Sequence, residues 1–501
     1  MRSFSLAVGL CLLVVPCGDV FAQTSQETIT VDAHDTGKPF PHFWEQMFGS
    51  GRAVLSMRES YRQDLRQVKQ ITDFRYARFH AIFHDELGVY TEDRQGKPVY
   101  NFDYVDQIYD GLLANGVKPF VELSFMPKLL AARLDYHPFW YKPIVSPPAD
   151  YAKWNALIQA FAQHLIDRYG IEEVSTWYFE VWNEPNIDFW TGRPAQQTYF
   201  ELYDHTARTL KAVNPRIRVG GPATAQAAWI DAIIAHTTQE KVPLDFVSTH
   251  AYGNDTAMDI LGHASPDIPP HQMLGAAIDK VHAQIAASAR PDIPLIWSEF
   301  NATYMSEREI TDSVYMGPWL ANIISEADGK VTMMSYWTFS DVFEEQGVIR
   351  QPFFGGFGLI AIYNLPKPSF NVFRLLHTLG DQRIPESAND VLVTKRKDGT
   401  IVLAAWNVAE PGVTVPTKSI TFTFKDVKGS ARVSISRVDH AHGEVLAAYD
   451  KMGAPTYPSQ EQLRQLREVA RPESPQVEHL HGGSFTLEVP AQGLAVVEVG
   501  R

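Results

Sequence analysis

The order of apolar and amphipathic segments over residues 40–379 limits the possible folds more than any other feature of this sequence. Eight short apolar segments predict strands, at 45–50, 74–83, 117–125, 175–184, 216–221, 245–252, 293–300 and 331–339. Longer stretches with helical spacing of apolar residues lie between them, as in 61–71, 101–116 and 151–170. Alternating strands and helices form parallel sheets, and eight units predict an α/β fold of the (β/α)8 TIM-barrel type over 37–380. An open doubly wound sheet is disfavoured, because no glycine-rich phosphate loop follows the first strand.

The pattern changes after about residue 380. Residues 390–408 predict a hairpin with Asp398 and Gly399 at its turn, and 418–427 and 483–500 alternate apolar and polar residues. A small C-terminal β-sandwich domain over 381–501 is therefore expected, with a helical insertion near 440–482 that holds one helix at 459–470. Residues 23–36 include the alternating stretch 27–35, which we expect to add a strand to this sandwich.

The first 22 residues read as a secretory signal peptide. Arg2 gives a basic start, an apolar stretch covers 6–15, and small residues precede a cleavage point after Ala22. The apolar stretch is too short to span a membrane, and Pro16 disfavours lipidation of Cys17. We therefore expect an exported protein, periplasmic or secreted. Cys11 and Cys17 are the only cysteines and lie in this signal, so no disulfide or thiolate metal site is expected in the mature chain.

The net charge of −14 argues against nucleic acid or an anionic membrane as a partner. No metal is expected either, since His440 and His442 lack a third ligand at a fitting spacing. We expect no cofactor.

Polar and aromatic residues gather where the predicted strands end, which is where barrel enzymes place their active sites. The candidates are His80, Asp85, Glu122, Phe125, Asn183, Glu184, His250, Tyr252, Glu299, Trp337, Glu344 and Glu345. Carboxylates, amides and imidazoles bind hydroxyl groups, and an aromatic ring stacks on the apolar face of a sugar. Hydrolysis of a glycosidic bond needs two carboxyl groups, and Glu184 and Glu299 end the fourth and seventh strands.

These segments resemble a known family. WNEPN at 182–186 and WSEF at 297–300 are similar to the two signatures of retaining (β/α)8 glycosidases. Within that clan the chain resembles glycoside hydrolase family 39, the β-xylosidase and α-L-iduronidase family. RFHAIFHDELGVY at 78–90 and YWTFSDVFEE at 336–345 are among the further segments that carry the resemblance, which covers nearly all of the mature chain.

The resemblance implies a role for each residue. Glu184 would be the acid/base and Glu299 the nucleophile, with the two carboxyl groups about 5–5.5 Å apart. Tyr252 would also donate to Glu299. The expected sugar contacts are Asn183 to the 2-hydroxyl, His80, Phe125, His250 and Tyr252 around the ring, Trp337 as the floor, and Glu344 and Glu345 on the remaining hydroxyls.

Other charged residues near these strands are open to structural interpretations. Arg78 can face the barrel interior beside His80, and it would hold Glu299 ionised. Glu180 shares a strand face with Glu184 but lies deeper, so we expect it to brace the barrel by pairing with an arginine. Glu122 has the same interpretation, with support of the site as its alternative. Asp85 is expected either at the pocket rim or as a loop cap.

The leading hypothesis is an exo-acting, retaining β-xylosidase that releases xylose from short xylo-oligosaccharides. Other family specificities stay open, including arabinose, galactose and exopolysaccharide substrates. An α-L-iduronidase would need a cation for its sugar carboxylate, and Lys128, Arg133, Arg193 and Arg350 are the nearby candidates. A non-catalytic carbohydrate-binding protein is disfavoured because both carboxylates are present. Residues 135–148 form the loop that decides between exo and endo action. The sequence leaves homo-oligomerisation open.

Overall fold

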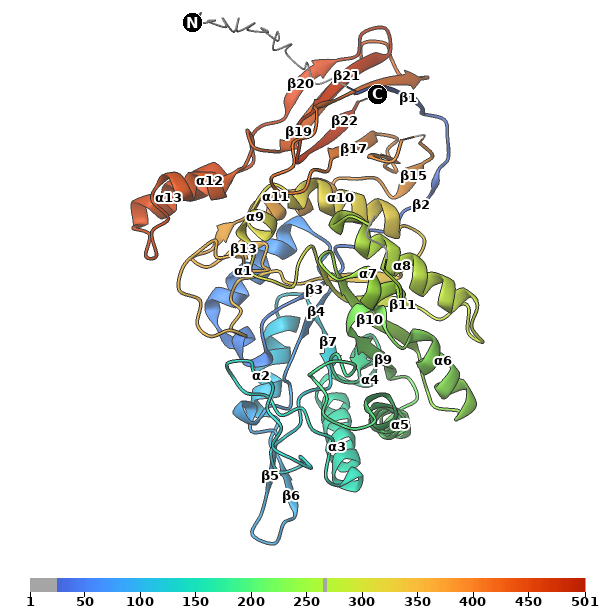
Figure 1. The fold of residues 1–501 in the computed structure, drawn as a ribbon, viewed down its shortest axis with the longest axis vertical. Coiled ribbons are helices and arrows are strands. Elements are labelled where there is room, and N and C mark those ends of the chain that lie inside the picture. Colours follow the sequence, from blue (N-terminus) through green and yellow to red (C-terminus); the bar gives the residue numbers. More distant parts are fainter. Residues whose placement is uncertain (1–24, 265–267, 387, 501) are drawn as a thin grey trace, which may run out of the picture.

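Eight parallel strands close into a barrel, which confirms the predicted fold class (Figure 1). The computed structural model describes residues 25–264, 268–386 and 388–500, so the predicted signal peptide lies outside the described residues. The barrel strands are β3 (Met47–Gly49), β4 (Tyr76–Phe79), β7 (Lys118–Glu122), β8 (Tyr178–Glu180), β9 (Arg218–Thr224), β10 (Phe246–Tyr252), β11 (Leu295–Asn301) and β12 (Met333–Tyr336). Each of the eight predicted segments overlaps one of them.

Helices connect the barrel strands and cover the outside of the barrel. They are α1 (Glu59–Ile71), α2 (Asp103–Leu113), α3 (Tyr151–Tyr169), α5 (Ala195–Val213), α6 (Ile230–Gln239), α8 (Pro270–Ala286), α10 (Met316–Ala327) and α11 (Pro368–Leu376). Shorter elements lie in the loops: η1 (Ala53–Met57), η2 (Asp85–Leu87), α4 (Ile171–Val174), η3 (Ala225–Ala227), α7 (Ala257–Leu261), α9 (Arg308–Thr311), and the strand pairs β5 (Tyr90–Glu92) with β6 (Pro98–Tyr100) and β13 (Ile360–Ala361) with β14 (Leu365–Pro366). No helix within the described ranges is long and apolar enough to cross a membrane.

The two ends of the barrel interior differ in polarity. At the amino-terminal end a cluster of apolar side chains fills the interior, made up of Met47, Phe120, Phe246, Ile296 and Met333. Further along the same strands the residues become polar, with Arg78 on β4, Glu122 on β7 and Glu180 on β8, all buried. The barrel interior is therefore an apolar core at the amino-terminal ends of the strands and polar towards their carboxyl ends, where barrel enzymes place their active sites.

Two sheets, the larger one antiparallel and the smaller one mixed, pack as a β-sandwich beside the barrel. The larger one contains β2 (Lys38–Pro39), β15 (Gln382–Ile384), β16 (Val391–Lys395), β17 (Ile401–Asn407), β22 (Gly493–Val499), β19 (Arg432–Val438) and β20 (Gln476–His479). The smaller one contains β1 (Ser25–Asp32), β18 (Lys418–Lys425) and β21 (Ser484–Val489), with β1 parallel to β18. Side chains of both sheets, such as Ile29, Phe422 and Leu403, form one core between them.

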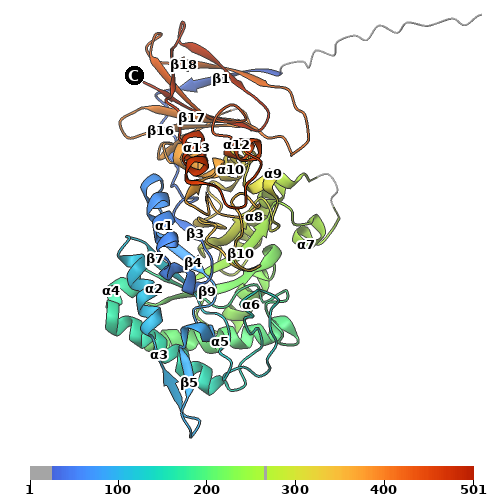
Figure 2. The same cartoon turned by 90° about the vertical axis from the view of Figure 1, so that its left-hand side faces the viewer.

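The sandwich lies against the barrel over α10 and α11 (Figure 1), and Figure 2 shows it above α10 from a second side. Gly317 of α10 permits the close approach, because a Cβ there would stand 3.2 Å from Cβ of Leu494 on β22. Two helices, α12 (Val445–Lys451) and α13 (Gln460–Ala470), project from the sandwich towards the barrel loops. The helix predicted at 459–470 is α13, which confirms that prediction. The short α12 was not predicted, and it buries Val445 and Tyr449 against Phe353 of a barrel loop. The last part of the predicted insertion is strand β20.

A buried lysine fixes the loop that follows β12. Lys367 is inaccessible to solvent, and its Nζ lies 2.6 Å from Oδ1 of Asp312 and 2.8 Å from Oδ2 of Asp341. The two carboxylates also accept backbone N–H groups of Gly355 and Gly358, at 2.6 and 2.7 Å. One cation thus holds two anions and the glycine-rich segment 353–358, and this segment carries Phe357 to the active site.

Replacing Lys367 with Met is expected to lower the free energy of unfolding by about 3–5 kcal/mol, because two buried carboxylates lose the cation that they share. Urea denaturation measures the change. The control is Lys397→Met, which removes a lysine that is 91% exposed and 3.6 Å from Asp381, and which we expect to change stability by less than about 1 kcal/mol. Equal stability of the two variants would contradict a structural role for the buried lysine.

Candidate active site

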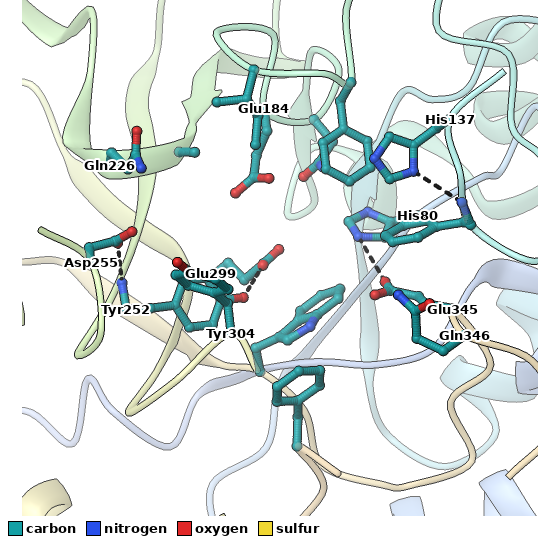
Figure 3. A pocket seen from close by; sticks show the side chains of 17 residues that line it. His80, His137, Glu184, Gln226, Tyr252, Asp255, Glu299, Tyr304, Glu345 and Gln346 are labelled. Atoms are coloured by element: carbon teal, nitrogen blue, oxygen red, sulfur yellow. Dashed lines mark hydrogen bonds and ion pairs between the residues drawn. The ribbon is translucent and has the colours of Figure 1, made fainter. Parts of the chain in front are cut away.

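A cavity of about 290 Å³ opens at the carboxyl ends of the barrel strands. Seven of the predicted residues line it: His80, Asn183, Glu184, Tyr252, Glu299, Trp337 and Glu345. The other lining residues are His137, Phe139, Ile187, Phe189, Ala225, Gln226, Asp255, Tyr304, Gln346 and Phe357. Figure 3 shows their side chains converging on the space between Glu184 and Glu299.

Glu184 and Glu299 form a close carboxyl pair. Glu184 lies four residues beyond the end of β8, and Glu299 belongs to β11. A carboxylate oxygen of one lies within 4.8 Å of a carboxylate oxygen of the other. Retaining glycosidases hold their carboxyl groups about 5–5.5 Å apart, whereas inverting ones need about 6.5–9.5 Å to admit a water. The spacing therefore fits the retaining mechanism.

Glu299 is held as an anion from two sides. Arg78 donates from Nη1 to Oε2 at 2.9 Å, and the hydroxyl of Tyr252 donates to Oε1. Burial raises the pKa of the Glu299 carboxyl above its ordinary value, and the charge of Arg78 and the hydrogen bond from Tyr252 limit this rise. Of the two carboxyl groups, Glu299 therefore has the partners that best stabilise a negative charge.

Glu184 has the surroundings of a protonated acid. Burial raises its pKa well above the ordinary value, and the charge of Glu299 raises it further. Nδ1 of His250 lies 2.9 Å from Oε1 of Glu184 and orients it. Burial lowers the pKa of His250 well below its usual value, and the charges of Arg78 and His80 add to this, so the imidazole is neutral. One proton shared by the pair therefore resides on Glu184.

Arg78 joins the carboxylates beneath the cavity. It is fully buried, and Nε donates to Glu180 at 2.7 Å while Nη2 lies 2.8 Å from Glu122. Glu180 therefore has the arginine partner that its position on the strand predicts. Nη2 also donates to Oδ1 of Asn183 at 2.9 Å. Since the amide oxygen is bound to Arg78, the Asn183 NH₂ group is the part left to donate to a ligand.

The far end of the cavity carries a second acid–histidine chain. His80 lies between Glu122, 2.7 Å from Nδ1, and Glu345, 3.6 Å from Nε2. Burial lowers the pKa of His80, but the charge of Glu122 and its hydrogen bond together outweigh burial, and the net shift is upward. Burial raises the pKa of Glu345 to about 8. Trp337 packs beside His80 at 4.9 Å between ring centroids. Gly49 makes room for it, because a Cβ there would stand 2.1 Å from the indole ring.

Three residues predicted to contact the sugar do not line the cavity. Phe125 is fully buried and stacks behind Phe189, 5.9 Å away. His250 is also fully buried, with its ring nitrogens directed to Glu184 and Ser298. Both act on the site only through the residues that they contact.

Glu344 is the third, and it corrects the prediction that both neighbouring glutamates hold hydroxyl groups. Arg52 donates to its Oε2 at 3.2 Å, and Arg58 donates to its two oxygens at 2.5 and 3.1 Å. Successive residues point in different directions, so Glu345 enters the cavity while Glu344 turns to the arginines.

Asp85 also lies away from the cavity. Its carboxylate is exposed and accepts the backbone N–H of Lys128 at 3.1 and 3.2 Å. Of the two alternatives for this residue, the contacts match the loop cap.

Much of the cavity wall comes from loops whose residues the sequence does not single out. His137 and Phe139 belong to the loop 135–148, and His137 stacks on Phe189 at 3.9 Å. The loop is attached to the opposite wall, since the N–H of Trp140 donates to the carbonyl of Glu345 at 2.7 Å. The aromatic residues shortly after WNEPN and within this loop could have indicated a cavity wall. Their contact with each other depends on the path of the loop, which the sequence does not show.

Glu184, His250 and Glu299 together offer three atoms of the kind that bind metal ions. The surroundings do not suit a cation. Arg78 already lies 2.9 Å from Glu299, and its guanidinium would repel a metal at the same carboxylate. The Arg78 charge balances Glu299, and a proton neutralises Glu184, so the pair needs no metal ion. A second set, His42, Glu45 and His377, lies far from the cavity lining and holds Glu45 by imidazole contacts of 2.7–2.9 Å.

Comparison with known proteins decides the family. A family model for glycosyl hydrolases family 39 matches residues 27–482. The chain belongs to glycosyl hydrolase family 39. It is therefore a glycoside hydrolase, as the sequence predicts.

Individual members of family 39 and related enzymes are similar over different lengths. A β-xylosidase of Geobacillus stearothermophilus is 39% identical over 438 residues, which cover 85% of this chain and 86% of that protein. The crystal structure of a monomeric β-xylosidase from Caulobacter crescentus CB15 superposes with a TM-score of 0.85 at 35% identity, covering 95% of this chain and 99% of that one. Human α-L-iduronidase is 30% identical over 178 residues, which cover 32% of this chain and 25% of that protein.

The hydrogen bond from Tyr252 predicts a change in the pH dependence of activity. Tyr252→Phe removes a donor that lowers the pKa of Glu299, so this pKa should rise. The attacking carboxylate of a retaining glycosidase must be ionised, so the acid limb of kcat/KM should move to higher pH. We also expect kcat to fall about 10–100-fold, because a hydrogen bond to a charged group is lost. Tyr304→Phe is the matched control, since Tyr304 lines the same cavity and is 54% exposed. An unmoved acid limb in Tyr252→Phe would exclude the hydroxyl as a partner of the nucleophile.

Proposed function

We propose that this family-39 enzyme is an exo-acting β-xylosidase that releases xylose from short xylo-oligosaccharides with retention of configuration. The observation that carries the proposal is the close pair of carboxyl groups with unlike partners, Glu184 with a neutral histidine and Glu299 with an arginine.

The geometry supports a two-step reaction. Glu299 attacks the anomeric carbon while Glu184 gives its proton to the glycosidic oxygen, so the leaving alcohol departs and a xylosyl ester forms on Glu299. Water then attacks the same carbon as Glu184 takes back a proton, and the ester bond breaks. Two displacements restore the original anomeric configuration. Asn183 would donate its NH₂ group to the 2-hydroxyl during both steps.

The lining of the cavity supports a neutral sugar. Among its described lining residues there is no lysine or arginine, and Arg78 below it is fully buried and already paired. An iduronide carries a carboxylate that would need such a partner. Lys128, Arg133 and Arg193 lie outside the lining, and Arg350 lines a wider neighbouring cavity of about 950 Å³. The α-L-iduronidase alternative therefore has no lysine or arginine among the described lining residues, and His80 in the lining is already paired with Glu122.

The loop 135–148 supports exo action. His137 and Phe139 line the end of the cavity that contains His80 and Glu345, and the backbone contact from Trp140 to Glu345 holds the loop there. A cavity of about 290 Å³ that this loop borders suits one sugar ring. The non-reducing xylose would occupy it, with His80, Glu345 and Trp337 around its outer hydroxyls and ring.

Export to the periplasm or the exterior is part of the same proposal, since the signal-like residues 1–22 precede the catalytic domain. Xylo-oligosaccharides from plant material would be met there.

Glu184→Gln and Glu299→Gln should both lose activity, but with different dependence on the leaving group. We expect Glu299→Gln to lose activity on every xyloside. Glu184→Gln should fall about 10²–10⁴-fold on xylobiose, the contribution typical of a positioned acid, and less on an aryl xyloside whose leaving group needs no proton. Steady-state kinetics on both substrates measures this.

Azide distinguishes the two roles in the corresponding alanine variants. Glu184→Ala should form β-xylosyl azide, because azide attacks the ester on Glu299 without a base, whereas Glu299→Ala should form α-xylosyl azide by a single displacement. The opposite anomers would reverse the assignment, and full activity of either glutamine variant would refute it. Glu180→Gln is the matched carboxylate control. It should lower the stability of the protein and leave the anomeric configuration of the product unchanged.

Xylose specificity is tested with a set of aryl glycosides. We expect kcat/KM for the xyloside to exceed those for the galactoside, glucuronide and iduronide by at least about 10²-fold. The carboxylate of the two charged sugars would meet no lysine or arginine among the described lining residues. A preference for the iduronide would contradict the neutral-sugar argument, and a lack of turnover on all of them would favour a carbohydrate-binding protein.

A further inference from the structure

One end of the cavity carries two polar side chains that the proposed reaction does not use. Asp255 and Gln226 line the cavity on the side of Glu184 that lies away from His80, His137 and Glu345 (Figure 3). Asp255 is only 9% exposed. A carboxyl group so far from solvent is costly unless it has partners, and a carboxylate that faces a sugar cavity has a partner when the ligand is bound.

Asp255 is fixed relative to the nucleophile. Its Oδ2 accepts the backbone N–H of Tyr252 at 2.7 Å, and the side chain of Gln226 hydrogen-bonds to it. Tyr252 in turn donates to Glu299. Asp255 therefore contacts the residue that donates to the nucleophile.

Gln226 is fixed relative to the proton donor. The peptide of its neighbour Ala225 is held by Asn186, which accepts the N–H at 2.9 Å and donates to the carbonyl at 3.0 Å. The N–H of Glu184 donates to the carbonyl of Ala223 at 2.8 Å. Gln226 itself has φ of 60°, in the left-handed region that non-glycine residues seldom adopt. Such strained positions persist where the surrounding structure determines them, and they cluster at ligand sites.

The two ends of the cavity cannot hold the same part of the substrate. The loop 135–148 lines the end that contains His80 and Glu345, and in the proposed function the terminal sugar occupies this end. The proton from Glu184 goes to the glycosidic oxygen, so the leaving group must extend past Glu184 towards the other end. Asp255 and Gln226 are the polar side chains that it meets there.

We propose that Asp255 and Gln226 form a subsite that binds the hydroxyl groups of the leaving sugar, which makes the enzyme selective for an uncharged pyranose as leaving group. This inference rests on the proposed xylosidase function. A carboxylate accepts from two hydroxyls, and an amide both donates and accepts, which matches the vicinal hydroxyls of a xylose unit. Burial raises the pKa of Asp255 to about 6, so the group is mainly an acceptor at neutral pH.

Two substrates that share the terminal xylose but differ in the leaving group test the subsite. Asp255→Asn and Gln226→Ala should lower kcat/KM for xylobiose about 10–100-fold, the effect of losing a hydrogen bond to a charged or buried polar group. The same variants should change kcat/KM for p-nitrophenyl β-xyloside less than about 3-fold, because that leaving group has no hydroxyls to bind and leaves without a proton. The matched control is Gln346→Ala at the opposite end of the cavity, which should change both substrates by the same factor.

Transfer to an acceptor gives a second measurement. With p-nitrophenyl β-xyloside as donor and xylose as acceptor, the acceptor must occupy the leaving-sugar subsite. Asp255→Asn should therefore form a smaller share of disaccharide than wild type, with the share transferred to methanol unchanged.

An equal loss on both substrates would overturn the proposal, because it would mean that Asp255 acts only by holding Tyr252. Unchanged kinetics on xylobiose in both variants would overturn it as well. Thermal unfolding of each variant separates these results from misfolding. If wild type cleaves neither xyloside, the proposed function fails instead, and the same comparison is then made with the disaccharide and aryl glycoside of the sugar that it does cleave.

Discussion

A single buried guanidinium determines how the charges of this active site are distributed. Arg78 reaches Glu122, Glu180 and Glu299 at 2.7–2.9 Å, and it also binds Asn183. Three carboxylates around one cation would leave an uncompensated negative charge, which is expensive away from water. His80 supplies a second positive charge beside Glu122, and its pKa is raised by that carboxylate after the opposing effect of burial. The barrel strands must bring all of these residues into register before the site can exist.

The charge distribution around Arg78 decides which of the two central carboxyl groups carries the proton. Glu299 contacts the guanidinium directly, whereas Glu184 contacts the neutral imidazole of His250. Adding the charge of Glu184 would place a further anion beside Glu299, so the pKa of Glu184 is raised by burial and by its neighbour. An acid and a nucleophile thus arise from two chemically identical side chains, because their surroundings separate their pKa values.

The sequence predicts the barrel well because strand alternation, helical periodicity and the carboxyl-end rule act locally. Glu184, Glu299 and Arg78 follow from strand ends and strand faces in the same way. Glu344 and Glu345 could not be separated, since the direction of each side chain depends on Arg52 and Arg58 from another loop. The cavity walls could not be predicted for a similar reason. His137 contacts Phe189 only because the loop 135–148 folds back. Asp255 is held at the cavity by a hydrogen bond from the backbone N–H of Tyr252.

The central claim is that Glu299 forms a covalent bond to the sugar and that Glu184 does not. A 2-deoxy-2-fluoro-xyloside with a good leaving group slows the second step, because fluorine removes the 2-hydroxyl contact and destabilises the positive charge that develops at the anomeric carbon. Mass spectrometry of the trapped enzyme after proteolysis then locates the ester. The account predicts one fluoroxylosyl group on the peptide that contains Glu299. A label on Glu184, or rapid turnover to the inverted sugar with no label, would contradict it.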